Sequence, residues 1–468
     1  MQLNPYPEYK ESGQPFLGKI PAHWDLFRNG RLFSQRNETG FGDLPILEVS
    51  LKTGVRVRDM DNLKRKQVMA DREKYKRAAQ GDIAYNMMRM WQGAIGVAPV
   101  DGLVSPAYVV VRPFPEVDCR YFSYLFRTTA YMNEVDAYSR GIVKDRNRLY
   151  WQDFKRMPSV VPPIAEQREI VRFLNHVGGK IQRFIRNKRR LIELLKEQKQ
   201  NIINQAVTRG VDPNVKLKPS GVEWIGDIPE HWNLRKFKHC AHCFSGGTPS
   251  KAVEKYWKGE LPWVSPKDMK SKYILDAVDH ISEDAVLNSS VGVIEAGRVL
   301  MVVRSGILRR TIPSGISTRR VAFNQDIKAI ATNPTHLNSE YLHALVEGCE
   351  KALLDAWRKV GATVESIEHE FMANTYLPLP SLKEQGQILA WIESESYLLD
   401  QSISKADREI ELMREYRARL IADVVTGQVD VRGIEVPEIA EEELRALEEG
   451  STDADDLLDA DEDLKAAE

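Results

Sequence analysis

Two long segments of the chain carry apolar residues at alternating spacings of three and four positions. The first stripe consists of Ile170, Leu174, Val177, Ile181, Phe184, Leu191, Leu195 and Ile202. The second consists of Ile388, Ile392, Leu399, Ile403, Ile410, Met413, Leu420 and Val424. This spacing is typical of coiled-coil helices, and about 40 residues predict a length of about 60 Å. Because neither helix can bury its stripe alone, we expect the two to pack antiparallel, with a kink at Gly178 and Gly179.

Outside these segments, short apolar runs alternate with glycine, proline and aspartate turns. The runs AYVVVRP at 107–113 and RVLMVVRS at 298–305 predict strands, because they are rich in valine and bounded by turn residues. Apolar residues recur at helical spacing in 121–135 and 339–357, which predicts helices there. Each of the two regions outside the long helices is therefore expected to be a domain of mixed α and β structure, and we call these regions the variable domains.

The chain also repeats itself. The segment KESGQPFLGKIPAHW from Lys10 and the segment KPSGVEWIGDIPEHW from Lys218 are identical at eight of fifteen positions. PPIAEQREIVRFL from Pro162 likewise matches PSLKEQGQILAWI from Pro380, at the start of each long helix. The order is domain, helix, domain, helix, which predicts an internal pseudo-two-fold frame. We place the boundaries as domains at 1–161 and 213–379, helices at 162–212 and 380–432, and a tail at 433–468.

Charge is distributed unevenly along the 468 residues. The segment from Glu435 holds fifteen acidic residues against Arg445 and Lys465, a net charge of −13, so the preceding residues carry +12. The basic part favours a polyanionic partner, and we expect disorder beyond about Arg432. The chain has no apolar run long enough to span a membrane, no secretory signal pattern and only four cysteines. We therefore expect a cytoplasmic protein without a membrane partner.

Each variable domain carries one basic segment. Residues 56–77 hold nine basic and four acidic residues, and residues 298–320 hold six arginines and no acid. A basic, glycine-containing loop follows in each half, SRGIVKDRNR from Ser139 and RKVGATVES from Arg358, and FSGGTPSK from Phe244 offers phosphate contacts. The predicted DNA-binding residues are Arg56, Arg58, Lys64, Arg65, Arg140, Lys144, Thr248, Lys251, Arg304, Arg309, Arg310, Arg319 and Arg320.

The sequence offers no catalytic residue or metal ligand that we would assign. His23 and His231 stand beside a proline and a tryptophan with no nucleophile at fixed spacing, so we expect them to pack at the domain entrances. Cys240 and Cys243 form a CxxC without the second pair that a zinc site needs. No cofactor loop or catalytic tetrapeptide of a DNA methyltransferase is present. The chain is therefore expected to recognise DNA while a partner performs the chemistry.

These motifs together resemble those of specificity subunits of type I restriction-modification systems. The resemblance is carried by the repeated KxSGxxxxGxIPxHW, the SGGTPS and YWKGELPWVS segments and the doubled PxxxEQ, and it covers about Lys10 to Val431. It implies that 24–159 and 232–378 are target recognition domains. The implied fold is mixed α and β (α+β), with two globular target recognition domains separated by two long antiparallel coiled-coil helices.

The resemblance implies a non-enzymatic subunit that reads a bipartite target in double-stranded DNA. Its partners would be two adenine-N6 methyltransferase subunits and ATP-dependent restriction subunits, so S-adenosylmethionine, ATP and magnesium are expected in the partners and no cofactor in this chain. The partner surface is expected on the outer stripes of the helices and at Glu166, Gln167, Glu384 and Gln385. Two alternatives stay open: a DNA-binding or decoy protein that works without methyltransferases, and a recognition chain with residual enzymatic activity.

Overall fold

Two helices of more than forty residues organise the protein: α5 (Ile164–Arg209) and α10 (Leu382–Val425). The computed structural model describes residues 3–51, 53–58, 72–141, 147–359 and 364–437. The chain divides into unit 1, which contains Met1–Arg190 and Asp407–Glu468, and unit 2, which contains Leu191–Ala406. Each long helix therefore contributes one part to each unit. No helix in the described ranges is long and apolar enough to cross a membrane.

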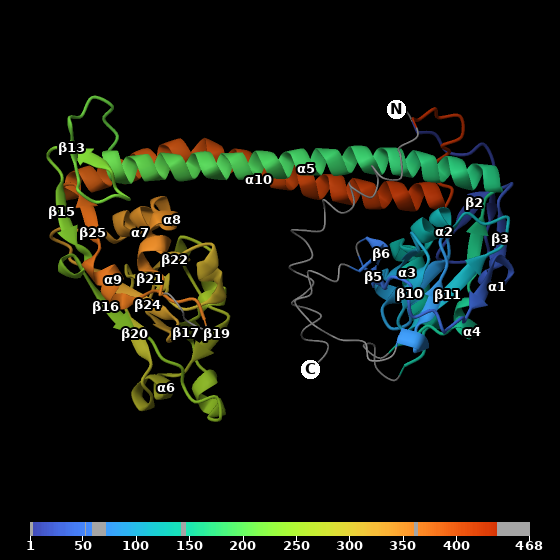
Figure 1. The fold of residues 1–468 in the computed structure, drawn as a ribbon, viewed down its shortest axis with the longest axis horizontal. Coiled ribbons are helices and arrows are strands. Elements are labelled where there is room, and N and C mark those ends of the chain that lie inside the picture. The colour runs from blue at the N-terminus through green and yellow to red at the C-terminus, as the bar shows by residue number, and fades with distance from the viewer. Residues whose placement is uncertain (1–2, 52, 59–71, 142–146, 360–363, 438–468) are drawn as a thin grey trace. The chain divides into compact units, whose positions relative to one another are not determined.

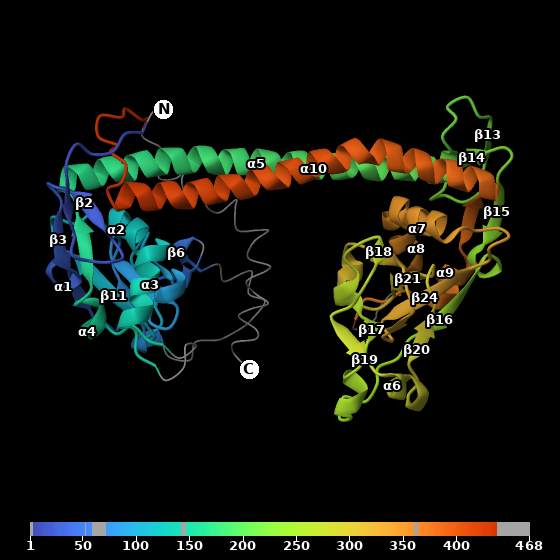
Figure 2. The same cartoon turned by 180° about the vertical axis from the view of Figure 1, so that it is seen from behind.

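The two long helices run antiparallel within each unit, side by side in Figure 1 and in the reverse view of Figure 2. In unit 1, Lys188 forms an ion pair with Glu409 at 2.6 Å, and Gly178 lies opposite Arg417, so numbering rises on one helix as it falls on the other. In unit 2, Lys199 pairs with Asp400 at 2.8 Å. The expected pairing is confirmed. Gly178 and Gly179 lie inside one unbroken helix, so they do not terminate it.

Unit 1 is built on a four-stranded antiparallel sheet of order β4-β11-β8-β9. Its elements are β1 (Tyr9–Glu11), β2 (Lys19–Pro21), β3 (Asp25–Arg28), α1 (Asn29–Leu32), β4 (Phe33–Arg36), β5 (Leu47–Ser50), β6 (Gly54–Val57), η1 (Arg72–Lys74), β7 (Lys76–Ala78), β8 (Ile83–Asn86), η2 (Met90–Gln92), β9 (Ile95–Val97), β10 (Gly102–Val104), β11 (Tyr108–Pro113), α2 (Cys119–Phe126), α3 (Thr129–Tyr138), α4 (Trp151–Phe154) and β12 (Pro158–Val161). The core joins sheet and helices through buried aromatic side chains, which include Phe33, Tyr85, Phe122, Phe126 and Phe154.

Unit 2 contains a five-stranded sheet of order β16-β24-β21-β22-β18 and a four-stranded sheet of order β19-β17-β23-β20. Its elements are β13 (Leu217–Pro219), β14 (Asp227–Pro229), β15 (Asn233–Lys236), η4 (Phe237–His239), β16 (Ala241–Ser245), η5 (Glu254–Trp257), β17 (Leu261–Val264), η6 (Pro266–Asp268), β18 (Tyr273–Ile274), β19 (Asp279–Ile281), α6 (Glu283–Asn288), β20 (Gly292–Ile294), β21 (Val299–Val302), η7 (Gly306–Arg309), β22 (Ser314–Ser317), β23 (Val321–Phe323), β24 (Ile327–Thr332), α7 (Ser339–Gly348), α8 (Glu350–Trp357), α9 (His369–Asn374) and β25 (Tyr376–Leu379). Unit 1 has matching strands: β5 pairs antiparallel with β6, β10 pairs antiparallel with β7, and Ile46 beside β5 bridges Leu103 of β10 in parallel, as β17 pairs in parallel with β23.

The repeated KxSGxxxxGxIP motif forms the same hairpin in both units. Strands β1 and β2 pair antiparallel, as do β13 and β14. Gly13 and Gly18 adopt φ values of 70° and 62°, and Gly221 and Gly226 adopt 73° and 70°. This left-handed region favours glycine, because a Cβ would be strained there. Backbone conformation therefore explains the glycine positions of the repeat.

The strand predictions at 107–113 and 298–305 are confirmed as β11 and β21. Each predicted helix is in fact two helices. A new N-cap divides the first, because the Thr128 side chain accepts from the Tyr131 amide, and the second is divided between α7 and α8 at Cys349. The prediction of disorder beyond about Arg432 does not hold for Ile434 and Val436, which pack on the unit 1 core, and the rest of the tail, 438–468, lies outside the described residues.

Candidate nucleic-acid interface

A buried carboxylate anchors the start of each long helix to the entrance of its domain. In unit 1, Glu166 accepts hydrogen bonds from the Trp24 indole at 2.9 Å and the Tyr6 hydroxyl at 2.6 Å, and His23 lies 2.8 Å away. In unit 2, Glu384 accepts from the Trp232 indole at 2.9 Å. The repeated IPxHW thus supplies a tryptophan that needs a buried acceptor, and the glutamate of PxxxEQ supplies that acceptor.

The glutamine of the same motif ties each long helix to a helix cap of the domain. Gln167 accepts from the Asp118 amide at 2.9 Å, and Gln385 accepts from the Asn338 amide at 2.8 Å. Both glutamine side chains are fully buried. The contact with a partner subunit that we expected at these motifs stays a prediction. Glu166, Gln167 and Gln385 are buried, Glu384 is half-buried, and all four direct their polar atoms to hydrogen bonds within the chain.

The end of each long helix packs against the domain of the other half of the sequence. The Tyr121 hydroxyl donates to the Val425 carbonyl of α10 at 2.9 Å in unit 1, and the Tyr341 hydroxyl donates to the Val207 carbonyl of α5 at 3.0 Å in unit 2. Each domain therefore contacts the start of one long helix and the end of the other, and we call this pair of contacts the seat of the domain. The seat holds each domain at an equivalent position on the long helices of its unit.

In unit 2, several arginines lie at one end of the strands of the five-stranded sheet, where β21 ends. Ser366 and Ile367 lie against the end of β21, where Arg304 pairs with Ser366 and the Ile367 amide donates to the Val303 carbonyl at 2.8 Å. One carboxylate, Glu365, lies 3.2 Å from a guanidinium nitrogen of Arg309 and 3.2 Å from one of Arg358. Arg304 and Arg310 are exposed nearby in the chain, on either side of η7. We call Arg304, Arg309, Arg310 and Arg358 the unit 2 strand-end cluster.

Thr248 lies at the same end of the strands of this sheet. Strand β16 runs parallel to β21 because both pair antiparallel with β24, so residues that follow β16 stand near those that follow β21. The Thr248 hydroxyl donates to the Gln325 side chain at 2.6 Å, and this bond is exposed. Lys251 is exposed in the loop that leads to η5. A hydroxyl and an amide therefore stand beside the arginines and can contact base edges or phosphates.

Unit 1 has an equivalent edge at the end of β8. The Leu149 amide donates to the Met87 carbonyl at 2.8 Å, the counterpart of the bond between Ile367 and Val303. Arg140 and Arg148 form a bridge that closes the loop between them. Arg140 also forms an ion pair with Asp153, and Arg89 begins the η2 turn. We call Arg89, Arg140 and Arg148 the unit 1 strand-end cluster.

Three members of these clusters, Arg89, Arg148 and Arg358, were not among the residues predicted to bind DNA. Arg148 and Arg358 belong to the two basic loops, whereas Arg89 lies in no basic segment, and only the pairing of loop and strand brings Arg89 into the cluster. Alignment of the two halves could have found it, because Met87 and Val303 occupy equivalent places. Lys64, Arg65 and Lys144 lie outside the described residues.

Other predicted DNA-binding residues lie away from these clusters. Arg319 follows β22, which is antiparallel to β21, so it stands at the opposite end of the strand pair from Arg304. Arg320 is held by Glu283, and this guanidinium lowers the pKa of the Glu283 carboxyl. Arg56 and Arg58 both face Glu48 on the β5-β6 hairpin, at 2.6 Å and 3.9 Å. The basic segments of the sequence are therefore not single surfaces.

Comparisons with known proteins show what parts of this chain are similar to. Residues 229–411 match the family described as type I restriction modification DNA specificity domain. The specificity subunit of the type I restriction enzyme EcoR124I/EcoR124II from Escherichia coli is 32% identical over 204 residues. The chain is thus similar to type I restriction-modification specificity subunits over part of its length. The match to the E. coli protein covers 43% of this chain and 47% of that relative, about half of its length.

More distant relatives extend the similarity over most of the chain. The putative type I restriction enzyme MjaX specificity subunit from Methanocaldococcus jannaschii is 22% identical over 451 residues, which are 91% of this chain and 98% of that protein. A chain of the solved structure "Structural basis underlying complex assembly and conformational transition of the type I R-M system" aligns with a TM-score of 0.60 at 16% identity. That alignment covers 87% of this chain and 98% of the other, so the fold is shared along nearly its whole length.

Proposed function

We propose that this protein is the DNA-reading subunit of a type I restriction-modification complex and has no catalytic activity of its own. One observation carries the proposal: a cationic strand-end cluster recurs at the equivalent edge of two domains that have diverged elsewhere. Two different readers on one repeated frame suit a target with two half-sites, each read by one unit. Arginine side chains can form bidentate bonds to guanine and charge-assisted bonds to phosphates, so both clusters have suitable chemistry.

The modification chemistry would belong to partner chains. Two methyltransferase subunits would use S-adenosylmethionine to methylate one adenine in each half-site, and restriction subunits would use ATP and magnesium. A repeated frame suits this division, because equivalent surfaces can hold one methyltransferase toward each strand. Chemistry on a base requires its removal from the stack by the modifying enzyme, so the reader needs only to supply register and sequence.

Partner contacts are proposed on the exposed apolar side chains of the long helices rather than at the helix entrances. In unit 2, Tyr397 is 59% exposed and Leu398 is 67% exposed on α10. Leu412 and Tyr416 are exposed on the part of α10 in unit 1. Exposed leucines and tyrosines on a helix that already buries one stripe are suited to a protein partner.

Single arginine substitutions test the assignment of the readers. Arg309→Ala should weaken discrimination at one half-site and Arg140→Ala at the other, each by about 1–3 kcal/mol, the contribution of a good base contact. The assay is competition binding of the assembled complex with duplexes that carry a base change in one half-site or the other. Arg319→Ala is the matched control, because Arg319 lies at the opposite strand end from the cluster. Equal loss at both half-sites from either variant would contradict the assignment.

A further inference from the structure

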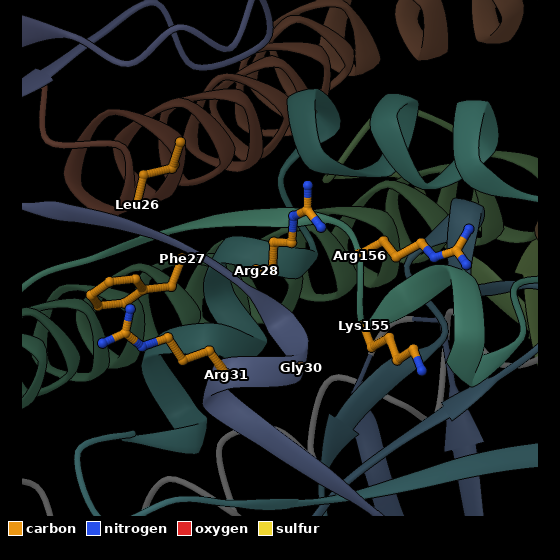
Figure 3. Close-up of a pocket in the computed structure, with 7 residues that line it drawn as sticks. All are labelled: Leu26, Phe27, Arg28, Gly30, Arg31, Lys155 and Arg156. Carbon is orange, nitrogen blue, oxygen red and sulfur yellow. The ribbon is translucent and has the colours of Figure 1, made fainter.

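Unit 1 has a basic groove that lies apart from its strand-end cluster. The groove encloses about 680 Å³ and is lined by Leu26, Phe27, Arg28, Gly30, Arg31, Lys155 and Arg156 (Figure 3). Strand β4, which follows α1, begins opposite Pro113, whereas the cluster follows the end of β8 that pairs with Tyr108. The residues after β8 and the start of β4 therefore stand at opposite ends of β11, about 16 Å apart along the sheet. The two sites approach each other at Arg140, which pairs with Asp153, two residues before Lys155. We call Arg28, Arg31, Lys155 and Arg156 the basic groove cations.

The floor of the groove is held by buried hydrogen bonds. The Asn29 side chain is fully buried, donates to the Tyr131 hydroxyl at 2.8 Å and to the Phe154 carbonyl at 3.1 Å, and accepts from Ser159 at 2.7 Å. The Gly30 amide donates to the Lys155 carbonyl at 2.9 Å. These bonds join α1 to the segment after α4. The two walls of the groove are therefore fixed relative to each other before any ligand arrives.

Acidic partners for the groove cations are absent from the part of the chain that the structure describes: no carboxylate there forms an ion pair with any of the four. The strand-end cations differ, since Arg140 pairs with Asp153 and Arg309 with Glu365. Four like charges around one groove repel one another, so an anion that enters it is attracted without first displacing a carboxylate.

The arrangement suits an extended anion better than a single ion. The Arg31 guanidinium lies 4.2 Å from the centre of the Phe27 ring, and Figure 3 shows Lys155 and Arg156 extending away from it on the other side. The charges therefore spread along the groove instead of meeting at one point. A nucleic-acid strand presents a series of charges, about one every 3.4 Å along its axis, so its backbone can contact several of these cations at once.

The equivalent place in unit 2 is built differently. The register of β15 with β25 makes Lys236 the counterpart of Arg28 and Lys238 the counterpart of Gly30. Lys238 donates to the Asn374 side chain at 3.0 Å, and Asn374 stands where unit 1 has Arg156. The position of Lys155 is taken by Ala373. Unit 2 thus has a hydrogen bond between two side chains, Lys238 and Asn374, where unit 1 has an open, arginine-rich groove.

We propose that the basic groove of unit 1 binds the phosphate backbone of duplex DNA beside the half-site read by the unit 1 strand-end cluster. This inference rests on the proposed function and adds a contact that carries no base specificity. It predicts an asymmetric footprint, in which the complex protects more DNA beside the unit 1 half-site than beside the unit 2 half-site.

The test is the salt dependence of DNA binding by the full-length complex. Removal of one phosphate contact lowers the slope of log K against log salt by about 0.9, so Arg31→Ala/Lys155→Ala should lower it by about 1.8. Over a fourfold rise in salt, wild-type affinity should then fall about 12-fold more than that of the variant. The ratio of affinities for target and scrambled duplexes should stay unchanged. Arg28→Ala/Arg156→Ala repeats the test with two exposed side chains if the first pair fails to fold.

The controls separate this inference from its alternatives. Lys236→Ala/Lys238→Ala removes the same charge from unit 2, and an equal fall in slope there would overturn the groove assignment. A groove effect that vanishes when residues 438–468 are deleted would overturn it too, because the acidic tail would then be the occupant. An unchanged slope in the groove variants with intact target preference refutes the groove alone. Absence of target preference in the wild type would instead refute the proposed function.

Discussion

Removal of the Glu166 carboxylate should destabilise unit 1 about twice as much as removal of Glu384 destabilises unit 2. Glu166→Ala would leave two buried donors without an acceptor, the Trp24 indole, which is 0% exposed, and the Tyr6 hydroxyl, whose residue is 3% exposed. Each unsatisfied buried donor costs about 1–3 kcal/mol, so the expected decrease in the free energy of unfolding is about 4 kcal/mol. Glu384→Ala would leave only the Trp232 indole without an acceptor, because His231 is exposed. The expected decrease in the free energy of unfolding is about 2 kcal/mol.

Amide hydrogen exchange followed by mass spectrometry can report each unit separately, through peptides from β3 for unit 1 and β15 for unit 2. Glu166→Gln is the matched control, because the Trp24 and Tyr6 donors bond the same oxygen of Glu166 and a glutamine carbonyl oxygen there can still accept from both, so it should lose much less stability than Glu166→Ala. Equal destabilisation by Glu166→Ala and Glu384→Ala would refute the reasoning. So would a decrease below about 0.5 kcal/mol for Glu166→Ala, since that is the range of ordinary surface substitutions.

Three further predictions follow from individual contacts and charges. Tyr121→Phe and Tyr341→Phe should each cost about 1 kcal/mol in urea unfolding, because each removes a buried bond to the end of a long helix, and no change would contradict the seat described above. Burial lowers the pKa of His343 to about 4, so the folded state binds fewer protons than the unfolded state and unit 2 should lose about 1.5 kcal/mol as the pH falls from about 6.5 to about 5. His343→Gln should remove that part of the pH dependence, and an unaltered profile would count against it. Deletion of 438–468 removes acidic charge and should raise affinity for non-specific DNA in a gel-shift assay, most strongly at low salt.

The repeated frame was predictable because it depends on local patterns. Apolar spacing located both long helices, and the structure begins α5 at Ile164 and α10 at Leu382, each within two residues of the predicted start. The glycines of the hairpin motif recur because the backbone there adopts positive φ. Such features follow from the conformational preferences of a few neighbouring residues, which the sequence displays directly.

The surfaces were harder to predict, because neighbours in sequence need not be neighbours in space. Arg309 and Arg319 lie in one arginine-rich segment, yet antiparallel pairing of β21 and β22 sends the residues that follow each strand to opposite ends. Polar residues at the start of a helix usually face solvent, but Glu166 and Gln167 are buried as acceptors for distant donors. These acceptors were invisible in the sequence because their partners are up to 160 residues away.

The basic groove shows the same difficulty in another form. Its cations come from two short segments, around Arg28 and around Lys155, and neither segment is rich in basic residues. Only the pairing of β3 with β12 brings the segments together. The number of basic residues in one stretch of sequence therefore does not locate a site whose residues come from separate segments that strand pairing brings together.

The most direct test of the central claim is a genome-wide map of methylated adenines in cells that express the methyltransferase partner with and without this chain. We predict a motif of two short half-sites separated by a fixed gap, methylated only when the chain is present, with Arg140→Ala and Arg309→Ala relaxing different half-sites. Methylation that is unchanged when the chain is absent, or a motif with a single undivided site, would contradict the claim that two units read two half-sites.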